Sequence, residues 1–513
     1  MTDEATTAPT TSDAQDEHRT YDVVVVGAGA VGENVADRAG RTGLSVVVVE
    51  QELVGGECSY WACMPSKALL RPGAVLAAAR AVPGAAEAVT GEIDRAAVLA
   101  RRSSFTSHWD DASQVEWLEG AGISLVRGAA RLTGPRELEV ASDDGSVLTL
   151  TARHAVVVAT GSEPVVPDID GLARSAPWTS REATSVEDVP ASLAILGGGV
   201  VGVEMATAFA DLGTHVTLIV RGDGLLSGFE PFAGEAVAAS LTELGVDVRL
   251  GTEVVEAHRE DSGVHLRLTT GSVLVAEQVL VATGRRPATA DLGLETVGLK
   301  PGAALTVDDS LAVKGVADGW LFAAGDVTGR VATTHQGKYQ ARAVGDVVAA
   351  RFGTPDAPSS TEDPDGPAVP GSEQPTAAAE SGAGPWSRYR ATADHAAVPQ
   401  VVFTRPEVAS VGLTESAARD AGLTVRTVDY AMGSVAGASV SADGYEGTAQ
   451  IVIDTDRGVI VGATFVGPEV AEMLHAATIA VVGEVPLERL WHAVPAYPTV
   501  SEVWLRLLET AGL

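Results

Sequence analysis

The 513-residue sequence is poor in cysteine and contains only Cys58 and Cys63. Two thiols cannot build the disulfide framework of a small secreted domain. Without a third cysteine or a nearby histidine they are also a poor zinc set, so no metal site is expected. A bridge between them would close so short a loop that it would restrict the unfolded chain little. A redox-active pair is therefore the leading interpretation, and two buried thiols that act as small hydrophobes are the alternative.

Long apolar runs and an excess of positive charge are also absent. No stretch of about 18 uninterrupted apolar residues occurs, and the polar, acidic residues 1–20 lack the apolar core of a secretory signal. The formal net charge of -33 would repel nucleic acid and anionic membranes. We therefore expect a cytoplasmic protein with no nucleic acid and no membrane among its partners, and a disordered acidic tail over residues 1–20.

Residues 21–50 carry a complete dinucleotide-binding pattern. Four valines that predict a strand precede a glycine-rich turn, an alanine-rich helix and a second strand that ends in Glu50. Gly27, Gly29 and Gly32 permit the tight turn, the close approach of a pyrophosphate and the helix–strand contact, while the helix N-terminus favours the phosphates. Glu50 lies where an acidic residue accepts hydrogen bonds from ribose hydroxyls. The segment is therefore predicted to bind a dinucleotide.

A second copy of the pattern begins at residue 194 and includes Gly197, Gly199 and Gly202. Two such units imply two bound nucleotides. The second strand of this copy is followed by Arg221 instead of an acid, and a guanidinium suits the 2'-phosphate of NADPH. NADPH is therefore favoured over NADH, and the alternative is that Arg221 only caps a solvated strand end.

The composition changes between residues 353 and 397, where Pro, Gly, Ser, Glu and Ala follow no apolar period. Such a segment buries too little surface to offset its ordering entropy, so it is predicted to be a disordered insertion. Patterned strands resume at residue 398 and are followed by a helix near residues 471–482. Residues 398–513 are therefore expected to form a separate α+β domain.

Further motifs occur along the chain. They are the Cys-x4-Cys-x-Pro-Ser-Lys run that ends at Lys67 and the segments 159–162, 282–287, 324–326 and 403–407. Together with the two glycine-rich turns they lie at intervals along residues 21–509, and the resemblance that they carry covers nearly all of this range except the insertion. In these motifs the chain resembles the FAD-dependent pyridine nucleotide-disulfide oxidoreductases, which include dihydrolipoamide dehydrogenase, glutathione reductase, mercuric reductase and soluble transhydrogenase.

That resemblance implies an α/β fold with two Rossmann-like dinucleotide-binding domains, for FAD and NAD(P), and a C-terminal α+β dimerisation domain that forms a homodimer. The FAD-binding domain would comprise residues 21–170 and 290–352, the NAD(P)-binding domain residues 171–289, and the dimerisation domain residues 398–513. The cofactor-binding residues that the motifs add are Gly56, Lys67, Thr160, Gly161, Gly284, Gly325 and Asp326. Of these, Asp326 resembles the carboxylate that holds the ribityl chain of FAD.

The resemblance also implies catalytic roles. Cys63 resembles the thiol that contacts the flavin and Cys58 the thiol that attacks substrate. Lys67 and Glu204 resemble the charged pair near flavin N5. The residues agree with the first assignment, because Cys63 starts a predicted helix over residues 64–80 and a helix N-terminus lowers the pKa of a thiol.

The chain departs from the family in its C-terminal signature. Where the family has a histidine that takes the proton of the substrate thiol, this chain has Tyr497, although the orienting glutamate is kept as Glu502. A phenol with a pKa of about 10 is only about 0.1% ionised at pH 7, whereas an imidazole near 6.5 can shuttle a proton. His492, earlier in the same segment, is the alternative proton carrier.

These observations predict an NAD(P)H-dependent FAD enzyme that passes electrons through Cys58 and Cys63 to a disulfide or another small electron acceptor, as dihydrolipoamide dehydrogenase does. One alternative is a diaphorase, in which the flavin reduces a quinone directly. Another is a flavoprotein redox sensor without turnover. Mercury is disfavoured as a substrate, because the chain has no additional C-terminal cysteines to bind it.

Overall fold

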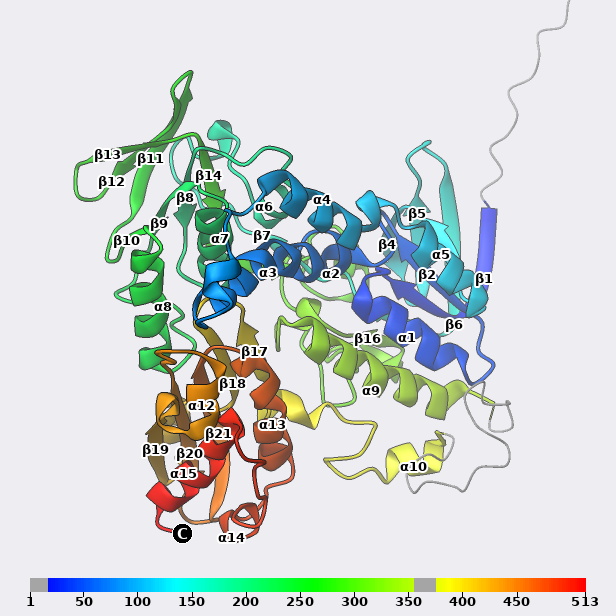
Figure 1. Cartoon of the computed structure of the whole chain (residues 1–513). Helices are drawn as coiled ribbons and strands as arrows, with labels where there is room; N and C mark the ends of the chain where they lie inside the picture. The colour runs from blue at the N-terminus through cyan, green and yellow to red at the C-terminus, as the bar shows by residue number, and fades with distance from the viewer. Residues whose placement is uncertain (1–16, 355–374) are drawn as a thin grey trace, which may run out of the picture.

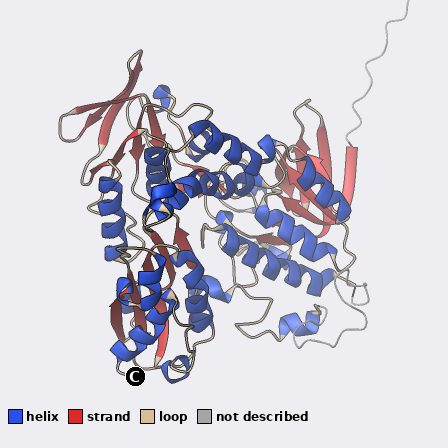
Figure 2. Ribbon diagram, in the orientation of Figure 1, coloured by secondary structure: helices blue, strands red, loops and turns tan. Residues whose placement is uncertain are grey.

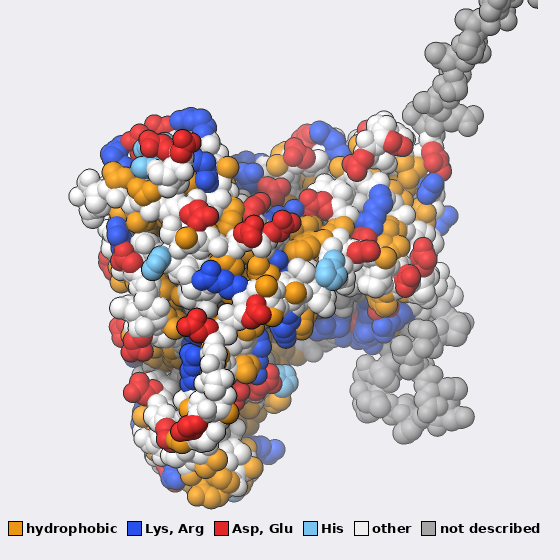
Figure 3. Space-filling model, turned by 45° about the horizontal axis from the view of Figure 1, so that its top comes forward, with side chains coloured by type: hydrophobic (Ala, Val, Ile, Leu, Met, Phe, Trp, Pro, Cys, Tyr) orange, Lys and Arg blue, Asp and Glu red, His pale blue; other side chains and the backbone are white. Residues whose placement is uncertain are grey.

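The computed structural model describes residues 17–354 and 375–513. These residues form three domains, each built around its own sheets (Figure 1). Figure 2 shows helices packed beside the sheets of all three domains, and acidic and basic side chains are interspersed over the face in Figure 3. In the described part of the chain, no helix combines the length and the apolar character needed to cross a bilayer.

The first domain contains a seven-stranded sheet in the order β3-β2-β1-β6-β5-β4, with β16 paired to β6. Its strands are β1 (Glu17–Val26), β2 (Val46–Glu50), β3 (Ser124–Arg127), β4 (Ala129–Gly134), β5 (Glu137–Ala141), β6 (Val147–Val158) and β16 (Leu321–Ala323). The strands β1, β2, β3, β6 and β16 pair in parallel, and the valines at positions 23–26 are buried. A parallel strand covered on both faces is a continuous apolar run, which is why these valines do not alternate with polar residues.

Two helices of this domain, α1 (Ala30–Gly40) and α9 (Thr334–Phe352), pack against each other and lie side by side in Figure 1. A Cβ atom on Gly345 would lie 2.5 Å from the Cβ of Arg38, so the glycine allows the two helices to approach closely. Because β16 and α9 follow the second domain in sequence, the first domain is assembled from two separate stretches of chain.

The second domain contains a four-stranded parallel sheet in the order β10-β9-β8-β14 and an antiparallel sheet in the order β11-β12-β13. The strands are β8 (Ser192–Leu196), β9 (His215–Ile219), β10 (Asp247–Arg249), β11 (Val254–Glu260), β12 (Gly263–Leu268), β13 (Val273–Ala276) and β14 (Gln278–Val281). Helices α7 (Val200–Asp211) and α8 (Pro231–Glu243) belong to the same domain. The glycine-rich turn before α7 repeats the arrangement that precedes α1.

The third domain is a five-stranded antiparallel sheet in the order β17-β18-β21-β20-β19. Its strands are β17 (Pro399–Val402), β18 (Glu407–Gly412), β19 (Val425–Ala431), β20 (Thr448–Asp454) and β21 (Val459–Gly467). The helices α13 (Leu474–Val482) and α15 (Val503–Ala511) contact this sheet, and β21 is buried along its whole length. The predicted fold class, two nucleotide-binding α/β domains followed by an α+β domain, is confirmed.

Two helices of the first domain, α2 (Gly56–Tyr60) and α3 (Cys63–Arg80), lead to the contact with the second domain. The short helix α2 is followed directly by α3, which contacts α7. Leu69 and Leu70 of α3 are buried in the apolar core of the second domain. The segment that carries both cysteines is therefore fixed between the two nucleotide-binding domains.

The prediction of disorder over residues 353–397 is wrong for the part that the structure describes. Residues 375–397 include the helix α10 (Ala377–Ser381), and Tyr389 and Ala391 are buried against the first domain. Residues 355–374 lie outside the described residues. The predicted tail over residues 1–20 is also too long, because β1 begins at Glu17.

A buried carboxylate explains why this segment is ordered. Asp346 of α9 is 2% exposed and accepts hydrogen bonds from Arg38 Nε and from Arg388 Nε, each at 2.6 Å. One anion thus joins α1, α9 and residues 375–397. Average composition does not reveal this order, because it depends on the ion pair of Arg388 and the burial of Tyr389 and not on the polar residues around them.

Candidate functional site

The two cysteines lie next to each other at the junction of α2 and α3. Cys58 is in α2, and Cys63 is the first residue of α3. Both are half-buried free thiols, and a hydrogen bond joins them. The Sγ atom of Cys63 also lies 3.2 Å from Oγ1 of Thr334, the first residue of α9. The pair predicted from the sequence is therefore brought together, at a point where three helices meet.

The environment makes the two thiols unequal. The pKa of Cys63 is lowered to about 6, first by the hydrogen bond from Cys58, then by Thr334 and by the charge of Lys67, although burial opposes these effects. The pKa of Cys58 is raised by the same hydrogen bond and by burial. The first peptide dipoles of α3 also favour a thiolate at its N-terminus. At neutral pH the negative charge of the pair therefore resides on Cys63.

Lys67 and Glu204 form an ion pair beside the thiols. Lys67 Nζ lies 2.8 Å from Glu204 Oε2, and Glu204 is nearly fully buried on α7. The second carboxylate oxygen accepts a hydrogen bond from the backbone N–H of Phe403 at 3.0 Å, and Lys67 lies 4.9 Å from the centre of the Phe403 ring. The pair thus links α3, α7 and the start of the third domain.

These residues line one large cavity of about 1320 Å³. Most of the predicted FAD-site residues also line it: Gly27, Gly29, Glu50, Gly56, Thr160, Gly161, Gly325 and Asp326. Pockets of about 300–1,000 Å³ hold drug-sized ligands, so this cavity has room for a dinucleotide. The first glycine-rich turn and the thiols open into the same space.

The first glycine-rich turn has the geometry that a dinucleotide requires. Glu50 Oε2 accepts from the backbone N–H of Ala28 at 2.7 Å, which holds the end of β2 against the turn. A Cβ on Gly32 would lie 1.8 Å from the carbonyl oxygen of Gly27, so only glycine lets α1 begin this close to β1. At Gly29 the nearest atom would be 3.8 Å away, which leaves the backbone open to a phosphate. These residues fit FAD.

Three of the short motifs converge at the wall of the cavity. Ser162 Oγ donates to Asp326 Oδ2 at 2.6 Å, and Arg285 Nε donates to Ser162 Oγ at 2.8 Å. The motifs 159–162, 282–287 and 324–326 therefore form one hydrogen-bonded chain, although they are far apart in sequence. These hydrogen bonds fix the carboxylate of Asp326 at the cavity wall.

The second glycine-rich turn repeats the packing of the first. A Cβ on Gly202 would lie 1.9 Å from the carbonyl oxygen of Gly197, which is the same close approach that Gly32 makes to Gly27 in the first turn. Gly199 has no neighbouring atom within 4 Å of such a Cβ, and neither does Gly284. The glycines of this turn do not line the large cavity, but Val200 and Glu204 of α7 do. A nucleotide on the second turn would therefore lie next to the cavity.

Arg221 lies just after β9 and is exposed. In the described ranges, 17–354 and 375–513, its side chain makes no hydrogen bond or ion pair. The guanidinium is thus available to an incoming anion, and its predicted role toward a 2'-phosphate stays a prediction.

Tyr497 and Glu502 lie in the third domain and do not line the cavity of this chain. Tyr497 is 78% exposed and His492 is exposed as well. Glu502 is buried, and its Oε1 accepts from Arg506 Nη2 at 2.7 Å. Its Oε2 is buried without a partner among the residues that the structure describes. Within one chain, these residues are not brought to the thiols.

Two cavity residues were not among the predicted site residues. Thr334 contacts Cys63, and Lys338 lies one helical turn later on the same face of α9, where it lines the cavity and its charge partly opposes the rise in the pKa of Cys58 that the Cys63 hydrogen bond and burial cause. Lys338 also opposes the effect of burial on Glu33, whose pKa is raised to about 7. The only sequence signal for this pair is the four-residue spacing at the start of a helix.

Arg181 is a third residue that the sequence does not mark. Its guanidinium pairs with Glu57, one residue before Cys58, and donates to Glu52 Oε2 at 2.8 Å. It also lies 4.3 Å from the centre of the Trp61 ring, and the two carboxylates raise its pKa against the effect of burial. Arg181 thus stabilises the segment of residues 52–61, which contains Cys58.

Comparisons with known proteins agree with this geometry. Residues 21–341 match the family described as pyridine nucleotide-disulphide oxidoreductase, and residues 398–507 match its dimerisation domain. The chain is 32% identical to a mercuric reductase of Streptomyces lividans over 493 residues, 94% of this chain and 95% of that protein. It is 31% identical to a dihydrolipoyl dehydrogenase of Thermus scotoductus over 498 residues, 96% of this chain and 97% of that protein.

Solved structures show the same fold. The HOCl-induced flavoprotein disulfide reductase RclA from Escherichia coli superposes with a TM-score of 0.76 at 23% identity, over 95% of this chain and 99% of that chain. LpdA from Mycobacterium tuberculosis superposes with a TM-score of 0.75 at 23% identity, over 97% of this chain and 100% of that chain.

Proposed function

The chain belongs to the pyridine nucleotide-disulphide oxidoreductase family, and we propose that its Cys58 and Cys63 carry electrons from NAD(P)H to a disulfide or another small acceptor. Members of this family are oxidoreductases that use FAD and NAD(P)H. The observation that carries the proposal is the unequal thiol pair, with its low-pKa member beside the Lys67–Glu204 pair in a cavity of dinucleotide size.

Residues of this chain would hold each cofactor. The first glycine-rich turn, Glu50 and Asp326 would hold FAD, and the second turn with Arg221 would hold the nicotinamide nucleotide. FAD, when bound, supplies the two-electron step between the nicotinamide and the thiol pair. Lys67 places a positive charge close to Cys63 and so stabilises its thiolate.

The thiol pair would carry two electrons to a disulfide acceptor in three steps. Two electrons and one proton convert the Cys58–Cys63 disulfide to a Cys58 thiol and a Cys63 thiolate. Cys58, after losing its proton, attacks an acceptor disulfide, forms a mixed disulfide and releases one thiolate of the acceptor. The Cys63 thiolate then attacks Cys58, restores the internal disulfide and releases the second thiolate. Per turnover, one NAD(P)H and one proton reduce one disulfide to two thiols.

A homodimer is part of this proposal. The match of residues 398–507 to a dimerisation domain supports it, and the third domain exposes several large apolar side chains. Val494 is 85% exposed, and Val440, Ile479 and Tyr497 are also exposed. Association of two copies through this domain would remove apolar surface from water, which is the main driving force for such contacts.

A disulfide and a quinone are the two candidate acceptors. Tyr497 stands where the family has a histidine, so disulfide exchange lacks its usual proton carrier. A quinone needs no such carrier and is the second candidate acceptor. Mercury is a weaker candidate although three of the relatives are named mercuric reductases, because Cys58 and Cys63 are the only thiols in the chain.

The test is a steady-state comparison of acceptors with the FAD-loaded protein. NAD(P)H oxidation is measured with lipoamide, glutathione disulfide or a quinone, in the wild type and in Cys58→Ser. We expect disulfide turnover to fall to background in Cys58→Ser, while any quinone turnover persists. A variant that retains disulfide turnover would refute the proposed role of Cys58.

A further inference from the structure

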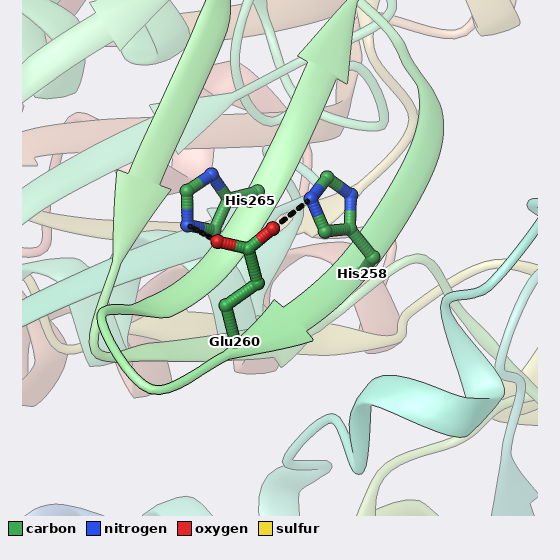
Figure 4. A group of neighbouring side chains, drawn as sticks. All are labelled: His258, Glu260 and His265. Atoms are coloured by element: carbon green, nitrogen blue, oxygen red, sulfur yellow. Dashed lines mark hydrogen bonds and ion pairs between the residues drawn. The ribbon is translucent and has the colours of Figure 1, made fainter.

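A second cluster of reactive side chains lies far from the thiols, on the hairpin of β11 and β12. His258 and His265 are direct partners in the antiparallel register of these strands, and Glu260 lies two residues after His258 on the same face. Figure 4 shows the carboxylate of Glu260 between the two imidazole rings. None of the three residues lines the large cavity.

The three side chains converge. His258 Nε2 lies 3.2 Å from Glu260 Oε1, and His265 Nε2 lies 3.4 Å from Glu260 Oε2. One ligand atom from each residue lies within 4.8 Å of the other two. The imidazole rings stack, with 4.9 Å between their centres and 20° between their planes. Two nitrogen donors and one carboxylate therefore point toward a common space.

This donor set matches a transition-metal site. Two histidines and one glutamate are a known zinc ligand set, with Zn–N and Zn–O distances of about 2.0–2.2 Å. A tetrahedral ion would need its ligands about 3.4 Å apart, so small rotations of these side chains would suffice. We propose that His258, Glu260 and His265 bind one divalent transition-metal ion of the zinc type. The fourth position stays open to water.

The charges around the cluster favour a cation. The one arginine on the same face of the hairpin, Arg267, is already paired with Glu256 at 2.8 Å, and Asp261 adds a carboxylate to the turn. In Figure 3, acidic side chains and histidines lie among basic ones over this end of the second domain. Ser262 Oγ lies 2.8 Å from His265 Nε2 and would give up this contact to the ion.

An ion at this position would link the two strands of the hairpin near its turn. β11 is also tied to the rest of the second domain, because Arg259 Nε donates to the carbonyl of Ser175 at 2.8 Å. Metal binding would therefore stabilise the hairpin in its present place on the domain. Because the site is separate from the thiols, this binding is independent of the proposed function.

The test uses zinc and a protein without thiols. Isothermal titration with Zn²⁺ is carried out on FAD-loaded Cys58→Ser/Cys63→Ser protein, so that the reduced pair cannot bind the metal. We expect one ion per chain. His258→Ala and His265→Ala should each weaken binding at least about tenfold, because loss of even an outer-shell partner of a metal ligand costs about 10–100-fold. His215→Ala, which removes an exposed histidine of the same domain, is the matched control and should bind as the parent does.

A second measurement guards against misfolded variants. Thermal melting with and without Zn²⁺ should show a higher Tm with zinc in the parent and in His215→Ala, and no zinc effect in His258→Ala/His265→Ala. Mg²⁺ and Ca²⁺ should not compete, since they prefer oxygen ligands. No saturable zinc binding by the parent, or equal affinity in the double variant, would overturn the proposal.

Discussion

Replacement of Cys58 by alanine should raise the pKa of Cys63. The hydrogen bond from Cys58 is the largest effect that lowers this pKa to about 6. A hydrogen bond to a charged group is worth about 1.5–3 kcal/mol, and one pKa unit corresponds to 1.36 kcal/mol. Since a thiol is a weak donor, we expect the lower part of this range, a rise of about one to one and a half units. Thr334 and Lys67 remain, so the pKa should stay below the ordinary value of about 8.5.

The assay is a pH titration of the FAD-loaded variants in their oxidised state. A Cys63 thiolate next to the flavin should give a long-wavelength charge-transfer absorbance, which appears as the pH rises through the pKa of Cys63. In Cys58→Ala the midpoint should lie about one unit above that of Cys58→Ser, because serine keeps a donor at this position. Cys63→Ser should show no band at any pH.

Two results would refute this reasoning. Equal midpoints in Cys58→Ala and Cys58→Ser would mean that the neighbouring donor does not set the pKa of Cys63. A charge-transfer band in Cys63→Ser would mean that the flavin-facing thiol is Cys58.

Three further predictions concern residues outside the thiol pair. Tyr497→His should raise the turnover of disulfides by a measurable part of the roughly 100- to 10,000-fold that general acid–base assistance supplies, and should leave quinone turnover unchanged. If the wild type already turns over disulfides efficiently and the variant does so less well, this prediction is wrong. Arg221→Ala should raise the KM for NADPH by roughly 10- to 150-fold and leave that for NADH nearly unchanged, whereas equal effects would exclude a 2'-phosphate contact. Asp346→Asn should lower the free energy of unfolding by about 3 kcal/mol in denaturant melts, because it leaves Arg38 and Arg388 without their buried anion. An unchanged melt would show that this pairing does not hold residues 375–397 in place.

Much of the fold could be predicted because local patterns determine it. Each local pattern specifies a short piece of backbone: the valine run of β1, the glycines of both turns and the acid at Glu50. Their order along the chain then matches one architecture. Lys67 and Glu204 are 137 residues apart, yet their positions in motifs were enough to pair them, and the structure joins them at 2.8 Å.

The remainder depends on contacts that no local pattern encodes. Thr334 of α9 lies beside Cys63 of α3 although the two are 271 residues apart in sequence, and the order of residues 375–397 depends on a buried carboxylate on a different helix. The cluster of His258, Glu260 and His265 exists only in the register of β11 and β12, since the spacing along the chain matches no metal motif.

The most direct test of electron transfer to Cys58 and Cys63 counts the free thiols of the protein before and after reduction. The FAD-loaded protein is unfolded and treated with a thiol reagent, first as purified under air and then after anaerobic incubation with one equivalent of NADPH. If Cys58 and Cys63 receive the electrons, the count should rise from none to two per chain, and Cys58→Ser should show one thiol in both states. An identical count in the wild type before and after NADPH would contradict the claim that this pair carries the electrons.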